Sequence, residues 1–160
     1  MANVRPLRKS GRTLPAPKRK PPKPRSRWHP AETEPAVKPG LGRRVTAEEL
    51  LEFRRPGVSD RAFRKLRGGR VDIEAELDLH GLTLSQARQA LRHFIDRCLQ
   101  GRLRCVRIIH GRGLGSGSQG PVLKADVNHQ LRHCEPVLAF VSAPAWDGGS
   151  GAVYVVLRRR

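Results

Sequence analysis

The stretch ELDLHGLTLSQARQALRHFIDRCLQGRLRCVRIIHG, residues 76–111, decides the fold, because it reads as a strand, a helix and a second strand in that order. Polar and apolar residues alternate over Glu76–Gly81, which predicts a short strand ending at a glycine turn. The apolar run Cys105–His110 also closes on His-Gly and predicts a second strand. Strands joined by a helix are expected to be parallel neighbours with a right-handed crossover.

The segment between these strands has the pattern of an amphipathic helix. Its apolar residues recur at helical spacing: Leu84, Ala87, Leu91, Phe94, Ile95, Cys98 and Leu99. Thr83 and Gln86 predict a capping box at its start, and Gly101 is predicted to be the left-handed residue that ends it.

A second helix and a hairpin are predicted to follow. The helix runs from about Pro121 to Arg132, since proline is tolerated at a first helical position. Strands over Val137–Ala143 and Ala152–Arg158 flank the glycine-rich turn 147–151, which favours an antiparallel pair. The order is therefore β-α-β-α-β-β, and we expect a compact two-layer α/β fold with a mixed sheet, in which strands separated by a helix are parallel neighbours.

Residues 45–70 predict a helical lead-in to the main domain, residues 71–160. A first helix is expected from Thr46, with an apolar face at residues 50–53 and an end at Pro56-Gly57. Ser59-Asp60 is expected to cap a second helix that ends at Gly68-Gly69 and carries Phe63 and Leu66.

Residues 1–44 differ sharply in composition. They hold nine of the 13 prolines and 13 Lys and Arg against only Glu32 and Glu34, a net charge of +11 out of the total of +18. With almost no aliphatic residues to offset chain entropy, this segment is expected to be a disordered basic arm. The remaining residues are also basic, at +7. This excess exceeds what solubility needs and predicts a nucleic-acid or ribonucleoprotein partner.

Cysteine spacing and hydropathy predict the compartment. Cys98, Cys105 and Cys134 match neither a zinc knuckle nor a redox pair, so we expect reduced core residues. No run of about 20 apolar residues could span a bilayer, and the basic, proline-interrupted start lacks the apolar stretch of a secretory signal. We therefore expect a cytoplasmic protein without a membrane partner; the sequence does not indicate an oligomeric state.

Asp78 and His80 are the first candidates for chemistry. Side chains alternate along a strand, so these two are expected on one face while Leu79 packs in the core. A carboxylate beside an imidazole fixes its tautomer and stabilises its protonated form, which suits proton transfer. The simpler interpretation is a solvated carboxylate and a histidine that caps the turn.

The repetition of His-Gly favours the functional interpretation. His80-Gly81 and His110-Gly111 both close strands that lead into helices, and the carboxyl ends of parallel strands form the ligand crevice of an open α/β sheet. Asp78, both histidines and Arg112 are therefore expected to converge. Three glycines of the turns could let a phosphate approach the backbone: Gly81, Gly111 and Gly113.

A metal site is the chemical alternative. Asp78, His80 and His110 are ligand types that suit a divalent ion, but the remaining ligands cannot be placed in the sequence. We therefore expect no cofactor. The remaining histidines are expected to be ordinary surface or boundary residues: His29, His93, His129 and His133.

With Glu76–Leu82 and Ile109–Gly113, the chain resembles the Smr (small MutS-related) domain family over about residues 70–158. Residues 55–58 and 64–69 look like the region that precedes the domain in stand-alone bacterial members. The resemblance implies the fold of the C-terminal domain of bacterial translation initiation factor three and an endonuclease activity.

Within the family, Asp-x-His is the proposed catalytic element, here Asp78 and His80, and His-Gly-x-Gly, here His110–Gly113, is associated with nucleic-acid contact and catalysis. Members include domains of MutS-like proteins that nick DNA and stand-alone proteins that cut messenger RNA at collided ribosomes. This chain looks more like the stand-alone kind. It departs from the family in its Gly-Ser loop, residues 114–120, and in its basic arm.

These observations lead to a metal-free hypothesis for RNA cleavage. His80, oriented by Asp78, takes the proton of a ribose 2′-OH, and the 2′ oxygen attacks the adjacent phosphate. Arg112 and the amides of residues 111 and 113 stabilise the added charge, and His110 protonates the leaving oxygen. The alternatives are a DNA-nicking endonuclease and a module that binds RNA or the ribosome without cutting.

Overall fold

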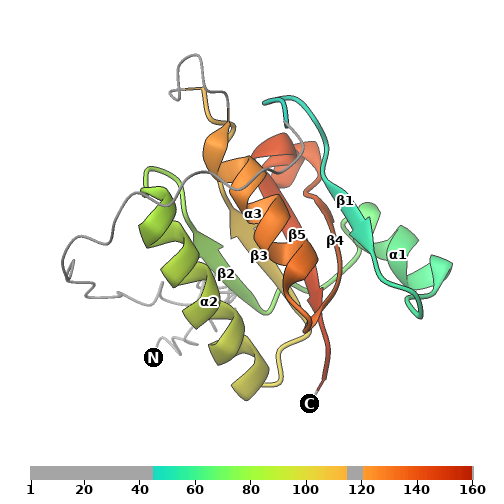
Figure 1. Ribbon diagram of the computed structural model, residues 1–160. Helices are drawn as coiled ribbons and strands as arrows, with labels where there is room; N and C mark the ends of the chain where they lie inside the picture. Colours follow the sequence, from blue (N-terminus) through green and yellow to red (C-terminus); the bar gives the residue numbers. More distant parts are fainter. Residues whose placement is uncertain (1–44, 115–120, 160) are drawn as a thin grey trace, which may run out of the picture. The chain divides into compact units, whose positions relative to one another are not determined.

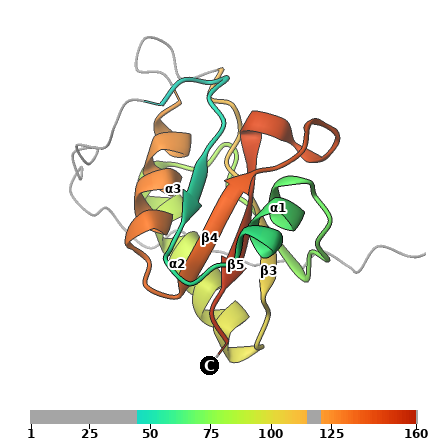
Figure 2. The ribbon, with the colours of Figure 1, turned by 90° about the vertical axis from the view of Figure 1, so that its right-hand side faces the viewer.

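The computed structural model describes residues 45–114 and 121–159; the expected arm and residues 115–120 of the Gly-Ser loop lie outside the described residues. The described strands form one mixed sheet in the order β1-β4-β5-β3-β2. Helices α2 and α3 cover one face of this sheet and α1 lies on the other (Figures 1 and 2). The predicted α/β class is therefore confirmed. The elements are β1 Glu52–Arg54, α1 Asp60–Arg67, β2 Ala75–Asp78, α2 Leu84–Gln100, β3 Cys105–Ile109, α3 Val122–His133, β4 Val137–Ser142 and β5 Ala152–Leu157.

The strand, helix and strand predicted from residues 76–111 are present, and β2 and β3 are parallel neighbours. The predicted capping box is also present: the Thr83 hydroxyl accepts from the Gln86 amide at 3.3 Å, and the Gln86 side chain accepts from the Thr83 amide at 3.1 Å. The role given to Gly101 is wrong. Its φ is −76°, because its amide still bonds to Arg97, and the left-handed residue is Arg102, with a φ of 55°.

The second helix and the antiparallel pair β4–β5 are confirmed, with two short 3-10 helices, Ala145–Asp147 and Gly149–Gly151, in place of a simple turn. The expectation that β3 and β4 are neighbours is wrong, because β5 lies between them and is antiparallel to both. Strand β5, AVYVVL, is apolar throughout and almost entirely buried. A strand of this kind gains most in the centre of a sheet, where both faces are covered.

The lead-in contains one of its two predicted helices. Helix α1 begins after Ser59, whose hydroxyl accepts from the Ala62 amide as expected. The helix expected from Thr46 is wrong, because part of this segment forms β1, which pairs with β4 at the sheet edge.

Tertiary contacts explain the error at β1. The Leu51 amide donates to the Ser142 hydroxyl at 2.7 Å, and the Ser142 amide donates to the Leu51 carbonyl at 2.8 Å. Phe53 stacks on Phe140 of β4, with ring centroids 5.4 Å apart. Pairing with an existing sheet edge thus overrides the local helix signal.

Two apolar cores lie on opposite faces of the sheet. Leu79, Ile108 and Val155 belong to the core under α2 and α3, whereas Phe63 and Leu66 of α1 belong to the other.

Cys98 and Cys105 are buried free thiols, and burial raises the pKa of each to about 11. None of the described helices is long and apolar enough to cross a bilayer.

Lys124, in the first turn of α3, is fully buried. Its ammonium group donates to the carbonyl oxygens of Thr46 at 3.1 Å and Ala47 at 3.0 Å, and also to that of Glu49. Burial lowers the pKa of this amine. Because a buried cation needs oxygen partners, Lys124 fixes the segment before β1 to the start of α3.

Helices α2 and α3 are joined by a largely buried ion pair. Arg88 Nε lies 3.0 and 3.1 Å from the two carboxylate oxygens of Asp126. We expect Arg88→Met to lower the free energy of unfolding by about 3 kcal/mol, because it leaves a buried carboxylate without its cation. Urea unfolding measures this loss.

A double variant separates the lost cation from lost packing. Arg88→Met with Asp126→Leu removes both charges and is expected to recover most of the stability. Arg97→Met, at an exposed position of the same helix, should change little. A double variant no more stable than Arg88→Met would contradict the explanation.

Candidate functional site

The carboxyl ends of β2 and β3 lie side by side and each leads into a His-Gly turn. The Leu79 amide donates to the Ile109 carbonyl at 2.7 Å, which ties the two ends together. The turns themselves are adjacent, since a Cβ added to Gly111 would lie 3.7 Å from the Cβ of His80. The convergence expected for the two motifs is thus present in the backbone.

Asp78 and His80 form the central pair of this site. His80 Nδ1 lies 2.5 Å from Asp78 Oδ1, and the His80 amide donates to the same oxygen at 3.1 Å. The carboxylate therefore fixes both the backbone and the ring of His80, while Leu79 between them is completely buried. The His80 side chain is 71% exposed. With Nδ1 held by Asp78, Nε2 is the nitrogen available to a ligand.

His110 lies in a different environment. Its side chain is buried beneath the sheet end, with Nδ1 2.8 Å from the Gly111 carbonyl and Nε2 enclosed without a described hydrogen-bond partner. Burial lowers the pKa of His110 to about 4, so the ring is neutral near pH 7. Because the Gly111 carbonyl is an acceptor, it assigns the ring proton to Nδ1.

The geometry of the ring does not support the expected role of His110 as proton donor to a leaving group. Its single proton is held by Gly111, and its other nitrogen is closed off from solvent. The His110 amide donates to the Gly151 carbonyl at 3.0 Å. His110 thus contributes by fixing the turn that follows it.

The Gly111–Gly113 turn packs against the start of α3. Gly113 has a φ of 73°, and a Cβ added to it would lie 2.4 Å from Pro121 Cα, so only glycine fits. The Gly111 amide donates to the Gly151 carbonyl at 2.9 Å and is not available to an anion, contrary to expectation. Arg112 is exposed and lies over the Gly149–Gly151 segment.

Gly81 and Ser150 complete the turn region. Gly81 has a φ of 77°, and nothing lies within 4 Å of a Cβ added to it, so this turn is open to a ligand. Ser150 was not singled out in the sequence. It is buried beside Gly151, and its hydroxyl has no described partner. Only the repeated glycines around Ser150 signal its special position.

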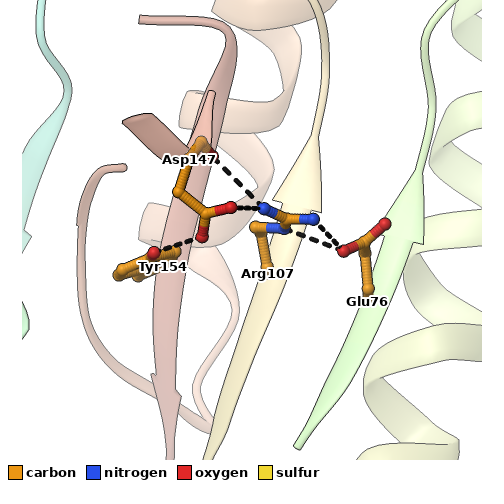
Figure 3. Close-up of polar contacts among 4 residues, drawn as sticks. All are labelled: Glu76, Arg107, Asp147 and Tyr154. Atoms are coloured by element: carbon orange, nitrogen blue, oxygen red, sulfur yellow. Dashed lines mark hydrogen bonds and ion pairs between the residues drawn. The ribbon is translucent and has the colours of Figure 1, made fainter. Parts of the chain in front are cut away.

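A polar network on the Asp78 face was also missed. Arg107 of β3 binds Glu76 of β2, and its Nε lies 2.9 Å from Oε2 of Glu76. Arg107 also binds the carboxylate of Asp147 in the 3-10 helix Ala145–Asp147. Asp147 in turn accepts a hydrogen bond from the Tyr154 hydroxyl (Figure 3). Glu76 and Asp78 are two residues apart on one strand and so share a face. The signal in the sequence was an arginine inside the apolar strand CVRII.

The ligands considered for a divalent ion are not assembled. Among residues 45–114 and 121–159, no three His, Cys, Asp or Glu side chains gather closely enough to hold a metal. Asp78 and His80 contact each other, whereas the imidazole of His110 is enclosed.

A mixed sheet with Asp-x-His and His-Gly-x-Gly turns at the ends of two parallel strands defines a class of small α/β domains. The sequence model of the Smr domain matches residues 77–158. The chain therefore belongs to the Smr domain family.

Individual relatives agree with this assignment. The chain is 35% identical to the "Probable DNA endonuclease SmrA" of Escherichia coli over 72% of its own length and 62% of the relative's, so it spans less than two thirds of that protein. It is 31% identical to a "Ribosome rescue factor SmrB" of Yersinia pseudotuberculosis over 74% of its length and 78% of the relative's. The structure of YdaL, a stand-alone small MutS-related protein from Escherichia coli, matches with a TM-score of 0.66 and 33% identity, over 78% of this chain and 95% of that chain.

Proposed function

We propose that the chain is an endonuclease that cleaves RNA, with His80 as the general base. The observation that carries this proposal is the exposed His80 ring, held 2.5 Å from Asp78 at the open end of the sheet. A base oriented by a carboxylate and open to solvent suits abstraction of a proton from a substrate. Membership of the Smr family and the name of the SmrA relative support nuclease activity.

The chemical step follows from the free nitrogen of His80. Nε2 takes the proton of a ribose 2′-OH, the 2′ oxygen bonds to the adjacent phosphorus, and the bond from phosphorus to the 5′ oxygen breaks. The leaving oxygen takes a proton from water, because the single ring proton of His110 is held by the Gly111 carbonyl. The products are a cyclic 2′,3′-phosphate and a 5′-hydroxyl.

Arg112 and the Gly113 amide are the groups that we assign to the charge developing on the phosphate. Arg112 is exposed and follows Gly111, the residue that lies against the His80 turn, and the Gly113 amide has no partner among the described residues. Preorganised donors of this kind stabilise a transition state more than a ground state. His110 and Gly151 hold the turn that presents them.

We propose that the substrate is messenger RNA on the ribosome. The SmrB relatives are named ribosome rescue factors, and the net charge of +18 favours a ribonucleoprotein partner. The name of the SmrA relative supports DNA as the competing substrate.

A mapped RNA cleavage site tests the reaction. We expect one 2′-deoxy substitution at that site to slow cleavage there at least 100-fold, since the mechanism needs the 2′-OH as nucleophile. Cleavage of the unmodified RNA is expected to survive EDTA and to leave a cyclic phosphate. End-labelled RNA on sequencing gels measures both.

Other outcomes distinguish the alternatives. Cleavage that is not slowed by the deoxy substitution, or that leaves a 5′-phosphate, contradicts the proposed chemistry and favours a DNA-type nuclease. Binding without cleavage, on both free RNA and ribosome-bound messenger RNA, indicates a binding module.

A further inference from the structure

Trp146 is a large aromatic side chain that the proposed reaction does not use. It lies in the 3-10 helix Ala145–Asp147 between β4 and β5 and is 74% exposed. The Phe and Tyr side chains in the described residues are buried or half-buried. An exposed indole is costly in water and useful when a flat partner covers it.

The Trp146 ring is held in place although it is exposed. A Cβ added to Gly69 would lie 2.9 Å from Cζ2 of Trp146 and 2.7 Å from Cγ of Pro144, so the glycine backbone packs against the edge of the indole. The next residue, Asp147, is anchored by Arg107 and Tyr154 (Figure 3). A ring fixed in this way loses little conformational freedom when a partner binds.

The same contacts link Trp146 to the proposed site. Arg107 binds Asp147 on one side and Glu76 on the other, and Glu76 lies two residues before Asp78 on β2. Nucleic acid that covers Trp146 therefore contacts the segment that contains Asp147. The two ion pairs of Arg107 join this segment to β2, which carries Asp78.

The segment that contacts the indole adjoins a strongly basic helix. Gly69, which contacts Trp146, follows the end of α1, and this region exposes five cations: Arg61, Arg64, Lys65, Arg67 and Arg70. Within the described part of the chain, only Arg67 of these has an ion pair, with Glu52. The others remain available to a polyanion.

We propose that Trp146 is a stacking platform for an unpaired base of single-stranded nucleic acid, with the cations of α1 and Arg70 holding the neighbouring phosphates. An exposed aromatic beside a basic surface is the arrangement that binds single strands with little sequence preference. The bases of a duplex are already stacked, so single strands bind more tightly. This inference deepens the proposed function by naming the strandedness of its substrate.

The test uses the full chain and a 12-nucleotide 2′-O-methyl RNA, which has no 2′-OH and so reports binding apart from cleavage. We expect Trp146→Ala to raise the Kd for this oligonucleotide about tenfold, from the stacking free energy of one base. Trp146→Phe should retain most of the affinity. Leu50→Ala, at a similarly exposed apolar position, is the matched control and should leave the Kd unchanged.

Fluorescence gives a second readout. The chain has two tryptophans, so Trp28→Phe leaves Trp146 as the only emitter, and its emission is expected to be quenched when the oligonucleotide binds. An unchanged Kd in Trp146→Ala, or equal losses for single strands and duplex, overturns the proposal. Unchanged oligonucleotide binding with weaker co-sedimentation with ribosomes also overturns it and assigns Trp146 to a protein contact. If the protein binds the oligonucleotide through Trp146 but does not cleave RNA, this inference holds and only the proposed reaction is refuted.

Discussion

His80→Ala is expected to cut RNA at least 100-fold more slowly than the wild type while binding the 2′-O-methyl oligonucleotide with the same affinity. The reason is that Nε2 of His80 is the proton acceptor of the reaction, and general bases contribute about 10²- to 10⁴-fold. The exposed ring supports no core packing, so the fold should be unaffected. Single-turnover cleavage at saturating protein isolates this step.

Two further variants sharpen the test. Asp78→Asn keeps the shape of the side chain but loses the charge that orients His80, and we expect an intermediate loss of rate. His93→Ala removes an exposed histidine from α2 and should cut at the wild-type rate. Cleavage by His80→Ala within threefold of the wild type would remove His80 from the mechanism.

Acid is expected to destabilise the fold through His110. Burial lowers the pKa of His110 to about 4 from an ordinary value of 6.5, so between these pH values the unfolded chain binds the proton and the folded chain does not. The free energy of unfolding therefore falls as the pH decreases from 6.5 to 4, by about 3 kcal/mol from this group. Urea unfolding at a series of pH values measures the slope.

His110→Gln is the variant that isolates this contribution. It cannot titrate in this range, so its unfolding free energy should depend less on pH between 4 and 6.5, whatever its stability at pH 7. The same slope in His110→Gln as in the wild type would refute the assignment.

Local patterns predicted the elements that depend on local forces. The apolar stripe and capping box of α2 and the turn before α1 are formed by residues close in sequence, and each was found. Strand β1 was mistaken for a helix because its partner, β4, lies about 90 residues away. The place of β5 between β3 and β4 depends on which pairing buries most surface, and no short window contains that comparison.

The site shows both the value and the limit of motif repetition. Alternation along β2 correctly placed Asp78 and His80 together. The two His-Gly pairs look equivalent, but Asp78 pairs with Ile109 in the register, so Leu79 rather than His80 is level with His110. The two histidines therefore belong to opposite faces, and His110 continues the buried row of Val106 and Ile108.

The central position of β5 has a consequence for synthesis. In the described sheet, β3 and β4 each pair with β5 and not with each other, and β5 is the last of the described strands to be made. A nascent chain that has not yet released residues 152–157 from the ribosomal tunnel has two separate halves of a sheet with their inner edges exposed. Folding therefore waits for these six residues, and a product truncated before them lacks the strand that makes the sheet continuous.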